Sequence, residues 1–197
     1  FVVAHTRVRA EKSGGAQAAY NRRRQECAQA LAILGETFPH GDDTPPSYSR
    51  LMSRIPLKEL LDTARTRLPS LLFRRFRHVV TEAERVYEAE KAMEREDLLS
   101  FGILMDSSHE SLRTDYEVSS RELDRLVELA RGAGAAGARL TGAGFGGCIV
   151  ALAAPSRLDR VLGTLRDGYY RDQGMEGPLA EVLFVASPSP GAEVHAL

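Results

Sequence analysis

The chain has 197 residues, of which 43% are hydrophobic and 27% charged, and its formal net charge is −1. These values exclude an overall electrostatic attraction to nucleic acid or to an anionic membrane, and the length favours one domain around one substantial core. No stretch reaches the roughly 18 apolar residues of a membrane span. Because Cys27 and Cys148 lie far apart without metal-ligand companions, we expect a soluble, cytoplasmic protein with reduced thiols and no bound metal.

The first part of the chain predicts a strand, a helix and a long connection. Residues 1–8 open on Phe-Val-Val-Ala without an initiator Met, and we expect a short strand cut from a larger fold. A flexible polar loop is expected over residues 9–19, followed by a helix that begins at Tyr20 and stops at Gly35. Residues 36–56 carry four prolines, which predict a surface connection without regular structure.

Helical spacing of apolar residues dominates the middle of the chain. It predicts a short helix over Leu57–Arg67, a long amphipathic helix after Pro69 and a further helix over residues 97–112. The sequence Ser-Ser-Arg-Glu at 119–122 has the form of a capping box and predicts another helix that ends within 132–137. The side chains expected to be buried are Phe73, Phe76, Val79, Val80, Ala83, Val86, Tyr87, Leu98, Phe101, Leu104, Met105, Leu123, Leu126, Val127 and Ala130.

The last part of the chain predicts a compact α/β unit. Strands are expected over residues 138–141, 148–153 and 181–186, with a helix capped by Ser156 before the last of them. Helix, strand, strand, helix and strand in this order are typical of a ferredoxin-like sandwich, in which helices cover one face of an antiparallel sheet. The expected fold class is therefore α+β, a ferredoxin-like sandwich with additional helices.

The most chemically suggestive stretch, Leu-Thr-Gly-Ala-Gly-Phe-Gly-Gly-Cys at 140–148, joins two predicted strands. Its glycines let backbone amides approach a ligand and face a shared anion-binding concavity, so phosphate is the expected guest. The spacing of Gly142, Gly144 and Gly147 also fits a dinucleotide fingerprint, but that motif needs a helix after the glycines, and here a strand is predicted. A P-loop is excluded because no Lys-Ser/Thr pair follows Gly147. On spacing alone, a hairpin that needs glycine for steric reasons is the stronger alternative.

Together with its surroundings, this stretch resembles the third signature motif of the GHMP kinases, in the form typical of the galactokinase family. Further segments match in galactokinase order and spacing, over essentially the whole chain. These segments are 20–24 with Glu26 and Cys27, 77–79 with Glu82, Arg85 and Val86, 101–105, 108–109, 111–113, 115–119 and 122–124. The resemblance implies a GHMP kinase C-terminal domain over 1–197. Within it, 1–56 holds the interdomain strand, loop and helix, 57–137 the helical part and 138–197 the glycine-loop α/β part.

The resemblance implies a reaction: transfer of the γ-phosphate of ATP, with Mg²⁺, to the 1-hydroxyl of galactose. The family's first and second signature motifs and its catalytic Asp lie N-terminal to the matching region. We therefore expect no catalytic residue in this chain, and ATP and Mg²⁺ bound mostly by the N-terminal half of the same kinase. Phosphoryl transfer needs nucleotide, metal and acceptor held in line, so the chain alone is expected to be inactive.

The resemblance also implies roles for individual residues. Tyr20 matches a tyrosine whose hydroxyl contacts the sugar, although an ordinary helix aromatic is the alternative, and Arg9 matches a basic residue near the phosphates. Phe145 is expected either to wall the pocket or to plug the core beneath it. The sequence departs from the family at Ala10 and Lys12, where His and Leu are usual. Residues expected near the nucleotide phosphates from the third motif are Gly142, Gly144, Phe145, Gly146 and Gly147.

Other polar residues are assigned to structure. His109 has no nucleophile or orienting carboxylate in a recognisable arrangement. The basic runs at 22–24 and 74–77 predict solvated faces and ion pairs. Asp-Tyr-Glu at 115–117 predicts a turn ahead of the capped helix rather than a metal site.

Three other functions remain open from the sequence. One is a GHMP kinase for another sugar, and a second is a galactokinase-like sensor that binds sugar and ATP and regulates a partner. The third is a stand-alone ferredoxin-like regulatory or interaction module, which the apolar first strand disfavours. The galactokinase hypothesis requires the glycine stretch to lie near Tyr20 and a concave pocket.

Overall fold

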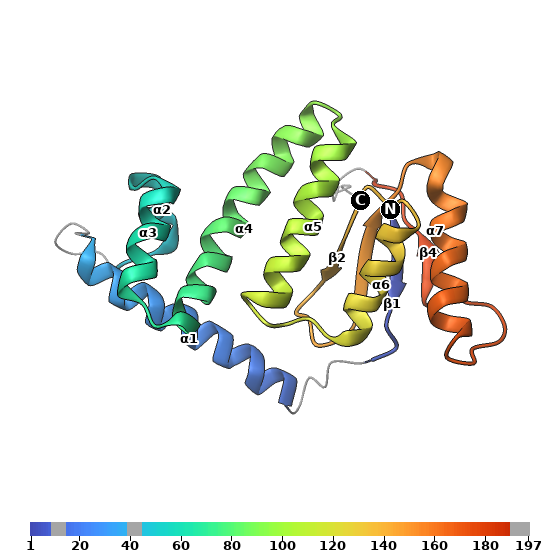
Figure 1. Cartoon of the computed structure of the whole chain (residues 1–197), viewed down its shortest axis with the longest axis horizontal. Coiled ribbons are helices and arrows are strands. Elements are labelled where there is room, and N and C mark those ends of the chain that lie inside the picture. The colour runs from blue at the N-terminus through green and yellow to red at the C-terminus, as the bar shows by residue number, and fades with distance from the viewer. Residues whose placement is uncertain (9–14, 39–44, 190–197) are drawn as a thin grey trace, which may run out of the picture.

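The computed structural model describes residues 1–8, 15–38 and 45–189. Helices gather at one end of the molecule and a sheet with two covering helices at the other (Figure 1). Within the described ranges, none of the helices combines the length and the apolar character needed to cross a bilayer. The elements are β1 (Val2–His5), α1 (Gly15–Thr37), α2 (Tyr48–Arg54), α3 (Leu57–Arg67), α4 (Ser70–Glu94), α5 (Leu98–Thr114), α6 (Arg121–Gly132), β2 (Gly137–Thr141), β3 (Cys148–Leu152), a 3₁₀ turn (Pro155–Arg157), α7 (Leu158–Leu165), a π-helical turn (Arg166–Arg171) and β4 (Leu183–Val185).

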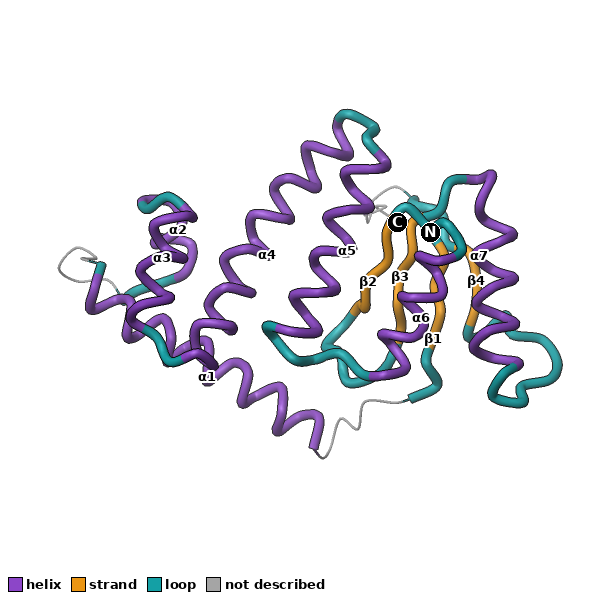
Figure 2. The backbone as a smooth tube through the Cα atoms, viewed as in Figure 1, coloured by secondary structure: helices purple, strands orange, loops and turns teal. Residues whose placement is uncertain are grey.

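The sheet has the strand order β2-β3-β1-β4, and all neighbouring strands are antiparallel. Ile149 pairs with both Ala4 and Leu140, so the buried side chains of these strands share one face. α6 and α7 cover that face (Figure 2), and their leucines and valines complete its core. This arrangement confirms the predicted α+β, ferredoxin-like sandwich, with α1 to α5 inserted between β1 and β2.

The molecule has two hydrophobic cores. The first lies between the sheet and α6 and α7, where Leu123, Leu126, Ile149 and Leu165 are fully buried. The second joins α1, α2, α3 and the beginning of α4. Its fully buried members are Ala30, Leu34, Leu60, Ala64, Phe76 and Val80. α5 packs on both α4 and β2, and so connects the two.

α5 covers the free edge of the sheet along β2. A Cβ on Gly102 of α5 would lie 2.1 Å from the carbonyl oxygen of Ala136, and one on Gly137 would lie 2.0 Å from the carbonyl oxygen of Gly102, so both glycines are required for this close approach. The edge amide of Ala138 donates to Asp106 Oδ1 on α5 at 2.8 Å. Pairing edge amides with a helix protects an exposed strand from association with other chains.

The N-terminal helical region differs from the prediction in three respects. α1 begins at Gly15, before Tyr20, and continues through the buried Gly35 to Thr37, so Gly35 is not a stop. Residues 36–56 also contain α2, which the prolines concealed. The Ser47 side chain caps α2 by accepting from the Arg50 amide at 3.3 Å, a signal that the sequence contained.

The caps of two helices and the buried faces of two others also differ from the prediction. Ser120 rather than Ser119 caps α6, accepting from the Leu123 amide, so the predicted reciprocal capping box is absent. Ser156 lies inside a 3₁₀ turn and does not cap α7. Four residues expected inside are exposed because no described segment covers that side of α4 and α5. They are Ala83, Val86, Tyr87 and Leu98.

Candidate functional site

The glycine loop, residues 142–147, connects β2 to β3 in a conformation that depends on its composition. Positive φ angles occur at five of its six residues: Gly142 (+84°), Gly144 (+83°), Phe145 (+61°), Gly146 (+134°) and Gly147 (+82°). Only glycine adopts such angles without a steric cost. Phe145 is the one residue with a side chain that adopts such an angle here. It packs against the sheet core, so of its two expected roles the structure supports filling the core beneath the loop.

Two backbone segments hold the glycine loop in place. The Phe145 amide donates to the Val118 carbonyl at 2.7 Å, and the Gly147 amide donates to the Val8 carbonyl at 3.0 Å. A Cβ on Gly144 would lie 2.1 Å from the Val118 oxygen, and one on Gly146 would lie 2.5 Å from the Val8 oxygen. These two glycines are therefore needed for approach to the protein's own backbone.

The other side of the loop is open. An added Cβ at Gly142 or Gly147 meets no atom within 4 Å, and Gly142 and Ala143 are exposed. Thr141, the last residue of β2 before the loop, lines a hollow of about 380 Å³ between α4, α5 and the uncovered sheet face. The glycines themselves do not line this hollow. The role of these glycines near a phosphate stays a prediction.

Tyr20 lies on α1, and the residue is 38% exposed. Arg23, three residues after Tyr20 on the same helix, donates to the carbonyl of Tyr116 at 2.7 Å, which fastens this part of α1 to residues 116–117. Tyr116 and Val118 are two residues apart, and Val118 binds the glycine loop. The helix that carries Tyr20 and the loop are thus brought to the same segment, while Arg9 lies outside the described residues.

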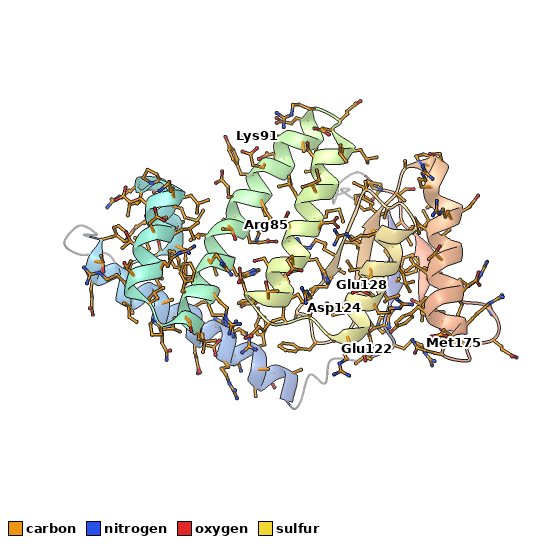
Figure 3. The ribbon with its side chains drawn as sticks, viewed as in Figure 1. Arg85, Lys91, Glu122, Asp124, Glu128 and Met175 are labelled. Carbon is orange, nitrogen blue, oxygen red and sulfur yellow. The ribbon has the colours of Figure 1, made fainter. Side chains whose placement is uncertain are left out.

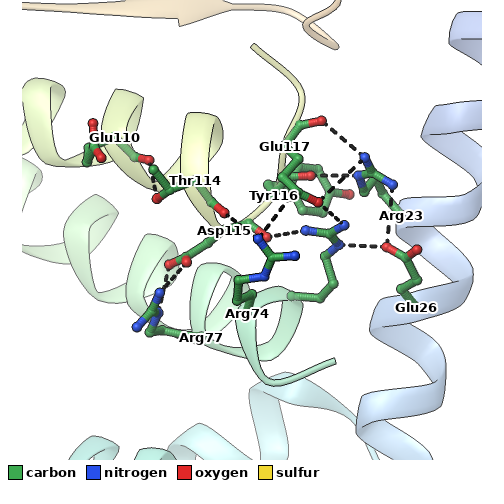
Figure 4. A network of polar contacts seen from close by, with 10 residues as sticks. Arg23, Glu26, Arg74, Arg77, Glu110, Thr114, Asp115, Tyr116 and Glu117 are labelled. Carbon is green, nitrogen blue, oxygen red and sulfur yellow. Dashed lines mark hydrogen bonds and ion pairs between the residues drawn. The ribbon is translucent and has the colours of Figure 1, made fainter. Parts of the chain in front are cut away.

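That shared segment, residues 114–118, is held by a network of arginines and carboxylates (Figure 4). Arg75 is buried with 1% of its side chain exposed, and it donates to Glu26 at 2.6 Å and to Glu117 at 2.5 Å. Although burial alone raises the pKa of Glu117, hydrogen bonds and charge from Arg75 and then Arg74 lower it overall, so the carboxylate stays ionised. We call the four arginines of this network the arginine clamp. They are Arg23 on α1 and Arg74, Arg75 and Arg77 on α4.

The clamp corrects two interpretations made from the sequence. The run at 74–77 forms ion pairs as predicted, but Arg75 is buried rather than solvated. Residues 115–117 form a turn, as predicted, yet they are also the acceptors of the clamp. Among 22–24, only Arg23 takes part, while Arg22 and Arg24 are exposed. The basic runs alone gave no indication of which arginine would be buried.

His109 is structural, for a reason that the sequence did not show. Its Nδ1 accepts from the edge amide of Leu140 at 3.3 Å, so the neutral ring carries its proton on Nε2, which lies 3.2 Å from Asp124 Oδ1. Asp124 is carried by α6 (Figure 3). An orienting carboxylate is thus present, contrary to expectation. Both ring nitrogens are engaged in fastening α5 and α6 to β2.

In the described ranges no three or more His, Cys, Asp or Glu side chains are grouped so that they could hold a metal ion. Cys27 and Cys148 are both free thiols. Burial raises the pKa of Cys27 to about 11, which leaves the thiol protonated and unreactive at neutral pH.

Comparison with known proteins agrees with the fold. Residues 89–171 match the family model described as GHMP kinases C terminal. The chain is 37% identical over 177 residues to a galactokinase of Haemophilus influenzae, covering 89% of this chain and 42% of that protein. It is 40% identical over 152 residues to a galactokinase of Bos taurus, covering 77% of this chain and 35% of that protein.

Among solved structures, a Lactococcus lactis galactokinase complexed with galactose superimposes with a TM-score of 0.72 and 32% identity, covering 88% of this chain and 42% of that one. An L. major mevalonate kinase in complex with R-mevalonate shares the fold, with a TM-score of 0.50 and 22% identity over 93% of this chain and 40% of that one.

The fold, the glycine loop and the family match define the class: the chain contains a GHMP kinase C-terminal domain. The chain spans 42% of the length of the Haemophilus influenzae relative. Within the class, its similarity is to galactokinases, and this similarity extends beyond the matched domain to 89% of the chain.

Proposed function

We propose that this chain is the C-terminal part of a galactokinase, which transfers the γ-phosphate of ATP to the 1-hydroxyl of galactose. The observation that carries the proposal is the position of the glycine loop. Val118 binds it, and Arg23, three residues after Tyr20 on α1, binds the neighbouring carbonyls of Tyr116 and Glu117. A loop suited to phosphates and the helix that carries a phenol suited to a sugar therefore meet at residues 116–118. The likeness to galactokinases over most of the chain supports galactose as the acceptor.

In this proposal the chain supplies part of the lining of the substrate-binding site and one contact to the sugar. The Tyr20 hydroxyl, which can both donate and accept, binds the sugar. The open side of the glycine loop at Gly142 and Gly147 lies near the nucleotide phosphates, and Arg9 is a further candidate for phosphate contact. Mg²⁺ neutralises charge on the transferring phosphate when it is bound. In this proposal ATP and Mg²⁺ are bound mostly by the N-terminal half of the same kinase.

The test compares the 197-residue chain with the complete protein that contains it, using radiolabelled ATP and Mg²⁺ with galactose, glucose or mevalonate as acceptor. We expect the complete protein to phosphorylate galactose with the highest kcat/KM and the isolated chain to transfer no phosphate, because positioning of nucleotide and acceptor is lost. Turnover by the isolated chain contradicts the division of roles. A complete protein that binds galactose and ATP without turnover is a sensor and not a kinase.

A further inference from the structure

The backbone carbonyls of residues 114–118, at the end of α5 and in the turn after it, all accept hydrogen bonds from other parts of the fold. Helix ends normally leave their last carbonyls to water or to local capping. Here Ser111 and Leu112 of α5 accept from backbone amides of the following turn, whereas the carbonyls of residues 114–118 accept from the clamp and the glycine loop. Thr114 accepts from Arg74 at 3.4 Å, Asp115 from Arg75, Tyr116 from Arg23 at 2.7 Å, Glu117 from Arg23 at 3.3 Å and Val118 from the Phe145 amide at 2.7 Å.

This row of acceptors lies between the two halves of the proposed site. Arg23 follows Tyr20 by three positions on α1, so both side chains lie on one face of that helix. Val118, at the other end of the row, binds the glycine loop. A displacement of residues 114–118 would therefore change the separation between Tyr20 and the loop.

The charges make the row rigid. Arg23 also lies 3.6 Å from Glu26, which pairs with the buried Arg75, and Arg77 binds the Asp115 carboxylate. Hydrogen bonds between ionised groups are directional and about twice as strong as neutral ones. Glu117 adopts a left-handed φ of +57°, an angle that is costly for a residue with a Cβ. A strained residue held by several ion pairs is a position that the surrounding structure determines.

We propose that the arginine clamp sets the separation between Tyr20 and the glycine loop, and that Arg23 is a positioning residue for phosphate transfer to the sugar. Arg23 is the member that joins α1 to the row, through the planar fork of its guanidinium on the carbonyls of Tyr116 and Glu117. A lysine keeps the charge but lacks this fork. The inference rests on the proposed galactokinase activity only where it concerns kinetics.

The experiment uses the complete protein with Arg23→Lys, Arg23→Gln and the matched control Arg22→Lys, which changes the exposed neighbouring arginine. Two quantities are measured: the KM and kcat for galactose and for ATP, and hydrogen exchange of the peptide that contains the glycine loop, without substrate. We expect Arg23→Gln to raise the galactose KM and the loop exchange rate about tenfold, as for one lost charge-assisted hydrogen bond. Arg23→Lys should show a smaller rise, and Arg22→Lys none.

The two measurements separate this inference from the proposed activity. If wild-type protein phosphorylates no galactose, the proposed function fails, and the exchange comparison alone decides on the clamp. Loop exchange in Arg23→Gln equal to that in Arg22→Lys overturns the clamp. Faster exchange with unchanged galactose KM overturns the positioning role, since Arg23 is then structural only. If Arg23→Gln does not fold, Arg23→Lys decides by the same criteria.

Discussion

At the scale of single residues, the four glycines of the loop divide into two pairs with different tasks. Gly144 and Gly146 have no room for a Cβ, because the Val118 and Val8 carbonyls occupy that space. Gly142 and Gly147 have room, and only their left-handed φ angles restrict substitution. The sequence motif presents all four alike, so spacing alone does not distinguish a glycine that serves the fold from one that faces a ligand.

Gly144→Ala and Gly142→Ala form a matched pair that tests this division. We expect Gly144→Ala to lower the free energy of unfolding by about 3–5 kcal/mol, since a backbone clash adds to the strained φ. Gly142→Ala should lower it by only about 1 kcal/mol, the cost of the φ angle. Urea unfolding of the two variants and the wild type provides the measurement.

The kinetics of the folded variant then test the phosphate side. In the complete protein, Gly142→Ala is expected to raise the KM for ATP, because its new methyl group lies on the open side of the loop. Equal destabilisation by the two substitutions contradicts the division into pairs. An unchanged KM for ATP with Gly142→Ala leaves the loop as a steric hairpin only.

At the scale of elements, most helices and strands could be predicted from the sequence. In these elements most of the residues that the apolar periodicity marks are also buried or half-buried. Leu57–Arg67 was predicted at its observed bounds, and the predicted strands at 138–141 and 148–153 differ from β2 and β3 by one residue at one end. The stripe Leu123, Leu126, Val127 and Ala130 is buried as predicted. In these elements local propensity and tertiary packing favour the same structure.

The sequence did not predict α2 or the full length of α1, because contacts between residues far apart in the sequence stabilise these helices. α2 forms among prolines, and its Leu51 is buried in the helical core. α1 runs through Gly35 because that position is buried, so packing overrides the helix-ending tendency of glycine. For the candidate site, the resemblance supplied Tyr20 and the glycines. The clamp could not be predicted, because the enclosure of Arg75 depends on Glu26 and Glu117, which are 49 and 42 positions away in the sequence.

The contact between α4 and α5 predicts a pH dependence of stability. His78 on α4 is buried, its Nδ1 lies 2.9 Å from Ser111 Oγ on α5, and its ring stacks on Tyr116 at 4.5 Å. Burial lowers the pKa of His78 from 6.5 to about 4. The unfolded chain therefore binds more protons than the folded chain between these values, and stability falls as the pH falls through this window.

We expect His78 to decrease the free energy of unfolding by about 1–2 kcal/mol between about pH 6.5 and about pH 5. Burial also lowers the pKa of His109, so two histidines contribute with the same sign. His78→Gln, which can still bond Ser111, should remove the contribution of about 1–2 kcal/mol that His78 makes to the pH dependence. Urea unfolding at several pH values measures it, and an identical slope in wild type and variant would contradict the assignment to His78.

At the scale of the whole molecule, the sheet core and the helical core are separate, and Arg75 lies between them. It begins on α4, beside Phe76 of the helical core, and reaches Glu26 on α1 and Glu117 in the turn that precedes α6. α5 provides an apolar connection as well, through its packing on α4 and β2. The buried arginine therefore joins the part of the chain that carries Tyr20 to the part that carries the glycine loop.

The substitution Arg75→Met tests how strongly the two parts depend on this residue. It leaves the carboxylates of Glu26 and Glu117 without their buried partner, and removing one member of a buried ion pair costs about 3–5 kcal/mol. The matched control Arg74→Met changes the neighbouring arginine, whose side chain is 38% exposed, and should cost at most about 1 kcal/mol. Urea unfolding followed by hydrogen exchange measures both effects. If Arg75 couples the cores, α2 and α3 in Arg75→Met exchange at lower urea than β3, whereas wild type and Arg74→Met lose protection in a single transition. A common transition in all three proteins would assign the coupling to α5 instead.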